Sequence, residues 1–159
     1  MRDRPAEIIE DAQHMDLAKA LFNRAWTLLD TADRSPTQDD EMVAAAHASF
    51  WHWLQVGDAR NFERGHWQIA RCCAAAGRGP EALHHAHMCL KSCQQHDHGA
   101  FDLAFAHESV ARASIACDAM DDARSHLEQA HNAGGCITSD DDKAWLEQNL
   151  AELQACVSA

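Results

Sequence analysis

The side chains best suited to chemistry in this chain are its twelve histidines and seven cysteines. His85, Cys89 and Cys93 step by four residues, so on a helix they share one stripe. Nitrogen and sulfur ligands at that spacing can hold zinc or copper. However, no CxxC or HExxH pattern accompanies them, so the sequence favours a packing role over a metal site. Seven such side chains crowd the same region: His84, His85, His87, Cys89, Cys93, His96 and His98.

A second group is the run HASFWHW, which covers residues 47–53. On a helix His47 and Trp51 share a face, whereas His52 points elsewhere. An aromatic cluster at helical spacing usually fills a core, and that is the favoured interpretation. The alternative is the floor of a pocket, in which tryptophan faces hold a small ligand and histidines form hydrogen bonds. The residues of this ligand-pocket alternative are His47, Trp51, His66 and His107.

Sequence patterns that carry catalysis are missing. There is no Gly-rich phosphate loop and no GxSxG motif, and the pair Cys72-Cys73 lies in a helical pattern without an orienting motif. The acidic run SDDDK at residues 139–143 lacks the Gly and the distal Glu of a calcium loop, so it is interpreted as a helix start. We therefore expect neither an enzyme nor a cofactor.

Helices must position these residues, because apolar side chains recur at helical spacing and Gly and Pro are few. The sequence predicts an all-α fold of about seven helices in stacked antiparallel hairpins. One domain would span residues 1–159, with a degenerate first hairpin at 15–57, repeat units at 61–98 and 100–134, and a capping helix at 139–156. Residues 5–13 either extend a first helix over 15–32 or form an arm. The expected helix caps are Ser35 with Gln38, Asp58 or Asn61, Asp118 with Asp121, and Ser139.

A 41-residue repeat underlies this organisation. Ala70-Arg71 recurs as Ala111-Arg112, and 111 − 70 is 41. The same shift carries His66 to His107 and His85 to His126. A period of this length is typical of a stacked helical hairpin. His66 and His107 are therefore expected to be half-buried and hydrogen-bonded in equivalent places.

The repeated pattern resembles the tetratricopeptide repeat (TPR) over about residues 61–134. In the first unit the large and small positions of the family are filled by His66, Ile69-Ala70, Cys73, Gly77, Ala82, Ala86 and Cys89. In the second they are filled by His107, Val110-Ala111, Ser114, Ala123, Leu127 and Ala130. The chain departs from the family where His, Cys and Ser replace aromatic residues, and its period exceeds the usual length of about 34 residues. HASFWHW also resembles a stretch of small uncharacterised bacterial TPR-like proteins, a likeness that brings no activity with it.

The resemblance implies a right-handed solenoid whose concave groove carries the residues Trp67, Arg71, Glu108 and Arg112. Repeated arginines on a groove can clasp a carboxylate in bidentate fashion, beside a tryptophan that offers a stacking face. The alternative is that each arginine pairs with a nearby acid of this acidic chain.

The negative net charge of the chain limits which kinds of partner it can bind. The formal net charge is −12, from 13 basic and 25 acidic residues, so we expect neither nucleic acid nor an anionic membrane as a partner. The N-terminal residues lack the apolar core of a signal peptide, and no apolar run approaches the roughly 18 residues of a membrane span. These features predict a cytoplasmic protein.

The leading hypothesis is a non-enzymatic interaction or scaffold module that binds a peptide segment or partner protein in its groove. The alternative is a small-ligand or metal-binding protein that uses the helices rich in His and Trp. A homo-oligomer is a further hypothesis, because short repeat arrays expose ends and grooves.

Overall fold

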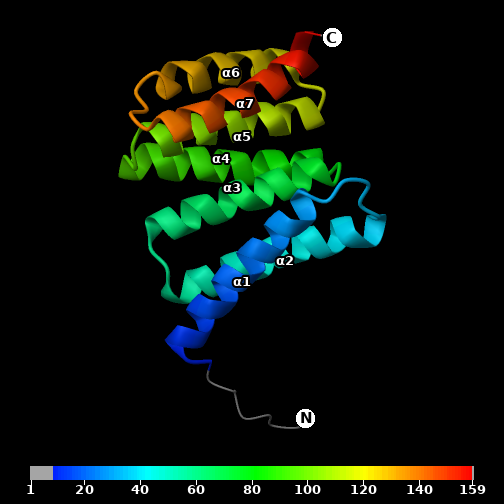
Figure 1. The fold of residues 1–159 in the computed structure, drawn as a ribbon, viewed down its shortest axis with the longest axis vertical. Coiled ribbons are helices and arrows are strands. Elements are labelled where there is room, and N and C mark those ends of the chain that lie inside the picture. The colour runs from blue at the N-terminus through cyan, green and yellow to red at the C-terminus, as the bar shows by residue number, and fades with distance from the viewer. Residues whose placement is uncertain (1–8, 159) are drawn as a thin grey trace.

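The chain folds into a stack of helices. The computed structural model describes residues 9–158, which form only helices, turns and short connections. The prediction of an all-α fold with seven helices is confirmed for these residues. The helices are α1 (Asp11–Leu29), α2 (Pro36–Val56), α3 (Ala59–Ala75), α4 (Gly79–His96), α5 (Ala100–Ala116), α6 (Met120–Gly134) and α7 (Asp140–Ser158). They follow one another from α1 and α2 at one end of the stack to α6 and α7 at the other (Figure 1).

Two kinds of contact organise the stack. Helices that are consecutive in the chain pack against each other, which is the expected result of their short connections. The odd-numbered helices also contact one another in the order α1, α3, α5 and α7. These four helices therefore form one continuous face, and side chains from distant parts of the sequence meet on it.

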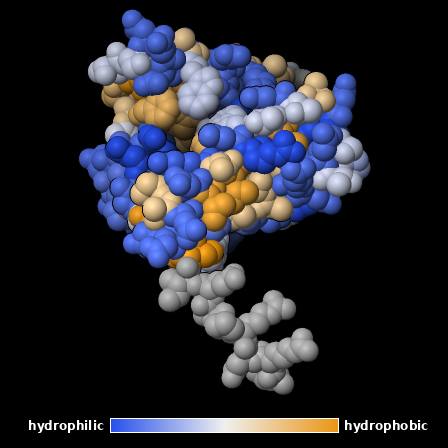
Figure 2. Space-filling view, turned by 60° about the horizontal axis from the view of Figure 1, so that its bottom comes forward, coloured by the Kyte–Doolittle hydropathy of each residue, from blue (hydrophilic) through white to orange (hydrophobic). Residues whose placement is uncertain are grey.

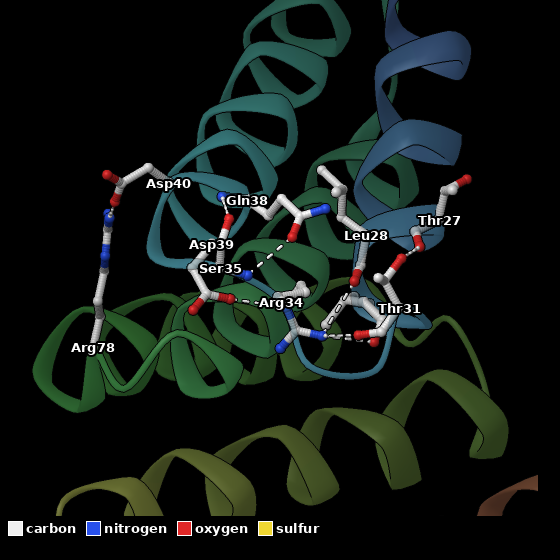
Figure 3. Close-up of polar contacts among 10 residues, drawn as sticks. Thr27, Leu28, Thr31, Arg34, Ser35, Gln38, Asp39, Asp40 and Arg78 are labelled. Carbon is white, nitrogen blue, oxygen red and sulfur yellow. Dashed lines mark hydrogen bonds and ion pairs between the residues drawn. The ribbon is translucent and has the colours of Figure 1, made fainter.

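The turn between α1 and α2 is fixed by local polar contacts (Figure 3). Ser35 Oγ accepts from the backbone N–H of Gln38 at 3.3 Å, and the Gln38 side chain accepts from the Ser35 N–H at 2.9 Å, as the sequence predicts. Arg34 Nη1 donates to the carbonyls of Leu28, Leu29 and Thr31 at the end of α1. The Leu28 carbonyl also accepts from the Thr31 N–H at 3.1 Å. Arg34 therefore adds a side-chain cap to carbonyl groups in the last turn of α1. The helix stops at Leu29, three residues before the predicted end.

The other predicted caps had mixed outcomes. The Asp58 side chain accepts from the N–H groups of Arg60 and Asn61 and caps α3, and Ser139 Oγ accepts from the Asp142 N–H at the start of α7. The prediction for Asp118 is wrong, because the residue before α6 is Ala119, without a side-chain cap. Of the proposed N-terminal extension, residues 11–13 belong to α1 and residues 5–8 lie outside the described part.

Asp118 instead forms the left-handed turn residue between α5 and α6, with φ of 58°. It stands 41 residues after Gly77, which has φ of 72° at the turn between α3 and α4. Glycine adopts this conformation without steric cost, whereas aspartate is among the few other residues that tolerate it. The turn geometry is thus shared by both units, although the residue type is not.

Small residues fill the helix contacts. Ala82 and Ala86 are fully buried, as are their repeat equivalents Ala123 and Leu127, so neighbouring backbones approach closely. At Gly65 in α3 a Cβ atom would lie only 2.5 Å from the ring of Phe50 in α2, which explains the glycine. The repeat positions that are small in sequence are therefore core positions in space.

The end of the stack formed by α1 and α2 leaves apolar side chains exposed. Figure 2 brings this end forward and shows apolar atoms interrupted by hydrophilic ones. The exposed large apolar residues on α1, α2 and the residues just before them are Ile9, Met15, Leu17, Trp51 and Leu54. None of the helices in residues 9–158 has the length and apolar character required to cross a membrane.

Candidate functional site

The predicted groove residues meet on the face of the odd-numbered helices. Glu108 in α5 is 1% exposed, and its Oε1 atom lies 2.7 Å from Arg112 Nη2 and 3.5 Å from Arg71 Nη1. Arg112 also reaches α7, where Nη2 donates to Asn149 Oδ1 at 3.3 Å and Nη1 lies 3.5 Å from Glu152. A single buried carboxylate thus holds arginines from α3 and α5, and Arg112 continues the network to α7.

Burial and mutual repulsion govern the charges in this network. Burial, followed by the like charge of Arg112, lowers the pKa of Arg71, and Glu108 partly offsets this effect. Burial acts in the same direction on Arg112, but attraction and hydrogen bonding to Glu108 raise its pKa overall. Both guanidinium groups remain charged at neutral pH. Glu108 Oε2 is buried and makes no hydrogen bond within residues 9–158.

Arg71 connects the charged network to an aromatic cluster. Its guanidinium carbon lies 5.6 Å from the ring centre of Trp26 and 5.8 Å from that of Trp67, within cation–π range. Trp67 is 8% exposed, so its ring is part of the wall and does not project freely. The Trp67 Nε1–H is buried and has no hydrogen-bond acceptor in the described chain.

The aromatic cluster lines a half-open cavity of about 410 Å³, which we call the aromatic pocket. Its aromatic walls come from all four odd-numbered helices: Phe22 and Trp26 from α1, Trp67 from α3, Phe101 and Phe105 from α5, and Trp145 from α7. The rings lie close together, with 4.5 Å between the centres of Phe105 and Trp145 and 6.1 Å between those of Trp67 and Trp145. The volume falls in the range of sites for small ligands or single large side chains.

Two acidic residues border this apolar space. Glu63 is 1% exposed, and its Oε2 atom lies 2.6 Å from His98 Nδ1. Burial is the main cause that raises the pKa of Glu63, and the hydrogen bond from His98 opposes it. Asp102 is held by Arg64 at 3.0 Å and Arg60 at 3.5 Å. Both acidic residues that border the aromatic pocket therefore already have partners.

A second cavity of about 370 Å³ lies beyond the arginines, and we call it the arginine pocket. It is bordered by Arg71 and Arg112 together with Leu29, Ile115, Glu152 and Leu153. Since Arg71 packs on Trp67, which lines the aromatic pocket, the two cavities adjoin along the same face. An elongated ligand could occupy both.

The histidines of the ligand-pocket alternative are divided between separate places. His47 and His66 both lie beside His85, with 3.2 Å from His47 Nε2 to Glu81 Oε1 and 2.8 Å between the Nδ1 atoms of His66 and His85. His107 instead pairs with His126 across α5 and α6, at 3.0 Å. Trp51 is half exposed and contacts His14 and His52 near the end of the stack.

Three histidines and two cysteines of these helices are neutral at pH 7. Burial is the main cause that lowers the pKa of His66, His85 and His107 to about 4, and neighbouring histidines add to it. Burial likewise raises the pKa of Cys93 to about 12 and that of Cys89 well above its ordinary value. The stripe of His85, Cys89 and Cys93 is not among the places in residues 9–158 where three potential ligand atoms lie within 4.8 Å of one another.

Sequence reasoning missed most of the aromatic pocket. Phe101 and Phe105 carry a local signal, since they are spaced by four residues and share a helix face. Trp26 and Trp145 come from the first and last helices, and no pattern in the sequence joins them. The closeness of His47, Glu81 and His85 was also not predicted.

The fold and this face together define an all-α protein with two adjoining cavities along its odd-numbered helices. No family model matches the chain, and searches of curated proteins and of solved structures found no match either.

Proposed function

We propose that the chain is a non-enzymatic, TPR-like interaction module that binds a peptide segment of a partner protein along its odd-numbered helices. In this proposal the hairpins form a short right-handed solenoid, α7 caps it, and the face of α1, α3, α5 and α7 is the concave groove. The observation that carries the proposal is the pair of adjoining cavities on that face, joined at Trp67 and Arg71.

The two cavities are suited to different chemical groups of the peptide. The aromatic pocket suits a large apolar side chain, which would remove apolar surface from water on both partners. The arginine pocket suits a carboxylate, because Arg112 holds the exposed Glu152 only at 3.5 Å and can exchange it for an acid of the peptide. The expected peptide therefore carries an apolar residue a few positions from an acidic one.

Selection from a library of random peptides displayed on phage tests this proposal. We expect enriched sequences that combine an aromatic or large aliphatic residue with Asp or Glu. Trp145→Ala should abolish their binding, because Trp145 forms one wall of the aromatic pocket. Trp51→Ala is the matched control, since Trp51 is a half-exposed tryptophan on α2 that lines neither cavity. Equal loss in both variants, or no enrichment, would reject the groove.

The arginines allow a second test, in which a partner is captured from the source cell. Substituting both Arg71 and Arg112 by Ala should weaken capture of a partner from the source cell. Because this change also leaves Glu108 buried without its partners, Arg112→Lys is the milder variant: it keeps the charge and loses the planar fork. Unchanged peptide affinity in Arg112→Lys would remove the arginine pocket from the proposal.

A homo-oligomer is a second proposal, supported by the apolar side chains exposed at the end formed by α1 and α2. Sedimentation at several concentrations tests it. Association that Leu54→Glu disrupts would support this end as the interface, and a monomer at all concentrations would reject it.

A further inference from the structure

A constellation of side chains outside the groove brings nitrogen and oxygen ligands together. It comprises His47 in α2 and Glu81 and His85 in α4, whose potential ligand atoms all lie within 4.8 Å of one another. His47 Nε2 and Glu81 Oε1 are 3.2 Å apart. Around a tetrahedral zinc ion with bonds of about 2.0–2.1 Å, neighbouring ligand atoms are separated by about 3.3 Å. We propose that His47, Glu81 and His85 bind one divalent late first-row transition metal of the zinc class.

The helices hold these ligands in place. Glu81 and His85 are four residues apart on α4, so they project from the same face one turn apart. His47 approaches from α2, and the ion pair of Arg78 with Asp40 ties the start of α4 to the start of α2 (Figure 3). All three ligand side chains are half-buried, which keeps them reachable by an ion from solvent.

A third histidine, His66, contacts the site through His85. The Nδ1 atoms of His66 and His85 lie 2.8 Å apart, so one of them donates a proton to the other. When His85 donates, its Nε2 atom carries a lone pair for a metal, and His66 accepts. A metal-binding histidine usually donates its other N–H in this way, which fixes the tautomer and the orientation of the ring. His66 is itself packed against Phe50, with 4.5 Å between ring centres.

The donor set selects the class of ion. Two imidazoles and one carboxylate suit zinc, cobalt, nickel or copper, whereas magnesium and calcium prefer sites made only of oxygen. Three protein ligands leave a fourth position for water or for another donor.

The repeat supplies a matched control within the same molecule. A shift of 41 residues takes Glu81 to Asp122 and His85 to His126, and His126 is again paired with a histidine, His107. The neighbouring histidine from the preceding even-numbered helix is His87 on α4, whose ring centre lies 6.5 Å from that of His126, against 5.3 Å between His47 and His85. Within residues 9–158 only the first set brings three potential ligand atoms of this kind within 4.8 Å.

The test is a zinc titration of untagged protein that has been dialysed against a chelator, read by competition with a chromophoric zinc indicator. We expect one zinc ion per chain. His47→Gln and Glu81→Gln should each weaken binding at least about tenfold, by removing a direct ligand. His87→Gln should bind zinc as the unchanged protein does. Circular dichroism of each variant verifies the fold.

Cobalt gives an independent readout, because bound Co²⁺ absorbs visible light according to its coordination geometry. His66→Gln is expected to weaken cobalt binding and shift its spectrum, since His66 positions His85 without touching the metal. Absence of saturable zinc binding would overturn the proposal. Affinity that is unchanged in His47→Gln and Glu81→Gln, or equally reduced in His87→Gln, would also overturn it and indicate adventitious binding to surface histidines.

Discussion

The two units related by the 41-residue repeat use the same positions for different chemistry. The position of Trp67 in α3 is that of Glu108 in α5, and each is followed four residues later by an arginine. In the first unit Arg71 packs on Trp67 beside the aromatic pocket, whereas in the second Arg112 pairs with the buried carboxylate of Glu108. The same repeat position thus holds an aromatic residue in the first unit and an acidic residue in the second. The face of the odd-numbered helices is therefore apolar beside the first unit and charged beside the second.

The two histidine pairs, in contrast, keep the same residue types and almost the same geometry in both units. His66 with His85 and His107 with His126 are equivalent in sequence and nearly equivalent in geometry, at 2.8 and 3.0 Å. They differ in the neighbouring histidine from the preceding even-numbered helix, His47 or His87, which lies closer in the first unit. The repeat thus preserves contacts within a hairpin, while contacts between hairpins give each unit its own properties.

The largest effect on stability should come from removing the buried carboxylate of Glu108 in the second unit. Glu108→Ala leaves Arg71 and Arg112 without their common partner, and we expect it to lower the free energy of unfolding by about 3–5 kcal/mol. Urea denaturation at pH 7 measures this. Glu152→Ala is the control, since this side chain is 63% exposed and should change stability by at most about 0.5 kcal/mol. A loss below about 1 kcal/mol for Glu108→Ala would contradict the assigned role.

A smaller effect on stability should follow when the pH is lowered, because the histidine pair of the second unit, His107 with His126, then becomes protonated. Burial and His126 lower the pKa of His107 from 6.5 to about 4, so the native state resists a proton that the unfolded chain accepts. Its stabilising contribution is complete above pH 6.5 and is lost as the pH falls, by about 2 kcal/mol at pH 5.

The matched variant for this effect is His107→Gln, which has no imidazole to protonate. Its unfolding free energy should decrease less than that of the unchanged protein between pH 7.5 and pH 5, by about 2 kcal/mol. Denaturant unfolding at both pH values measures the difference. Equal decreases in the two proteins would show that His107 is not the group that resists protonation.

The smallest effect concerns the turns at equivalent places of the two units. Asp118→Gly should raise the free energy of unfolding by about 0.5–1 kcal/mol, and Gly77→Asp should lower it by a similar amount, because both positions have positive φ. A Cβ atom at position 77 would meet no other atom within 4 Å, so backbone conformation alone is tested. Asp118→Asn separates charge from conformation and should be nearly neutral. Thermal unfolding of the three variants gives the answer, and effects of the reverse sign would contradict it.

The sequence predicted features that depend on local spacing or on the repeat. The Ser35 and Asp58 caps were found because the partner residues lie three positions away, and the meeting of Arg71 with Glu108 and Arg112 follows from stacking of equivalent helices. Asp118 was misassigned because an acidic residue before a helix suits both a cap and a left-handed turn, and only the backbone conformation distinguishes them.

The remaining features depend on contacts that no local pattern encodes. Trp67 is buried because Trp26 and Trp145, from the first and last helices, pack against it. His47 meets His85 through the contacts that α2 makes with its neighbours, and α2 lies outside the repeat. Such distances are set by the packing of whole helices, which the spacing of residues along one helix does not specify.

The groove is tested most directly by the indole N–H signals of the five tryptophans in an NMR titration of ¹⁵N-labelled protein with a selected peptide. We predict that the signals of Trp26, Trp67 and Trp145 shift in a saturable manner, since these rings line the aromatic pocket, while that of Trp51 stays unchanged. A saturable shift of Trp51 with unchanged signals for the three pocket tryptophans would contradict the proposed binding face.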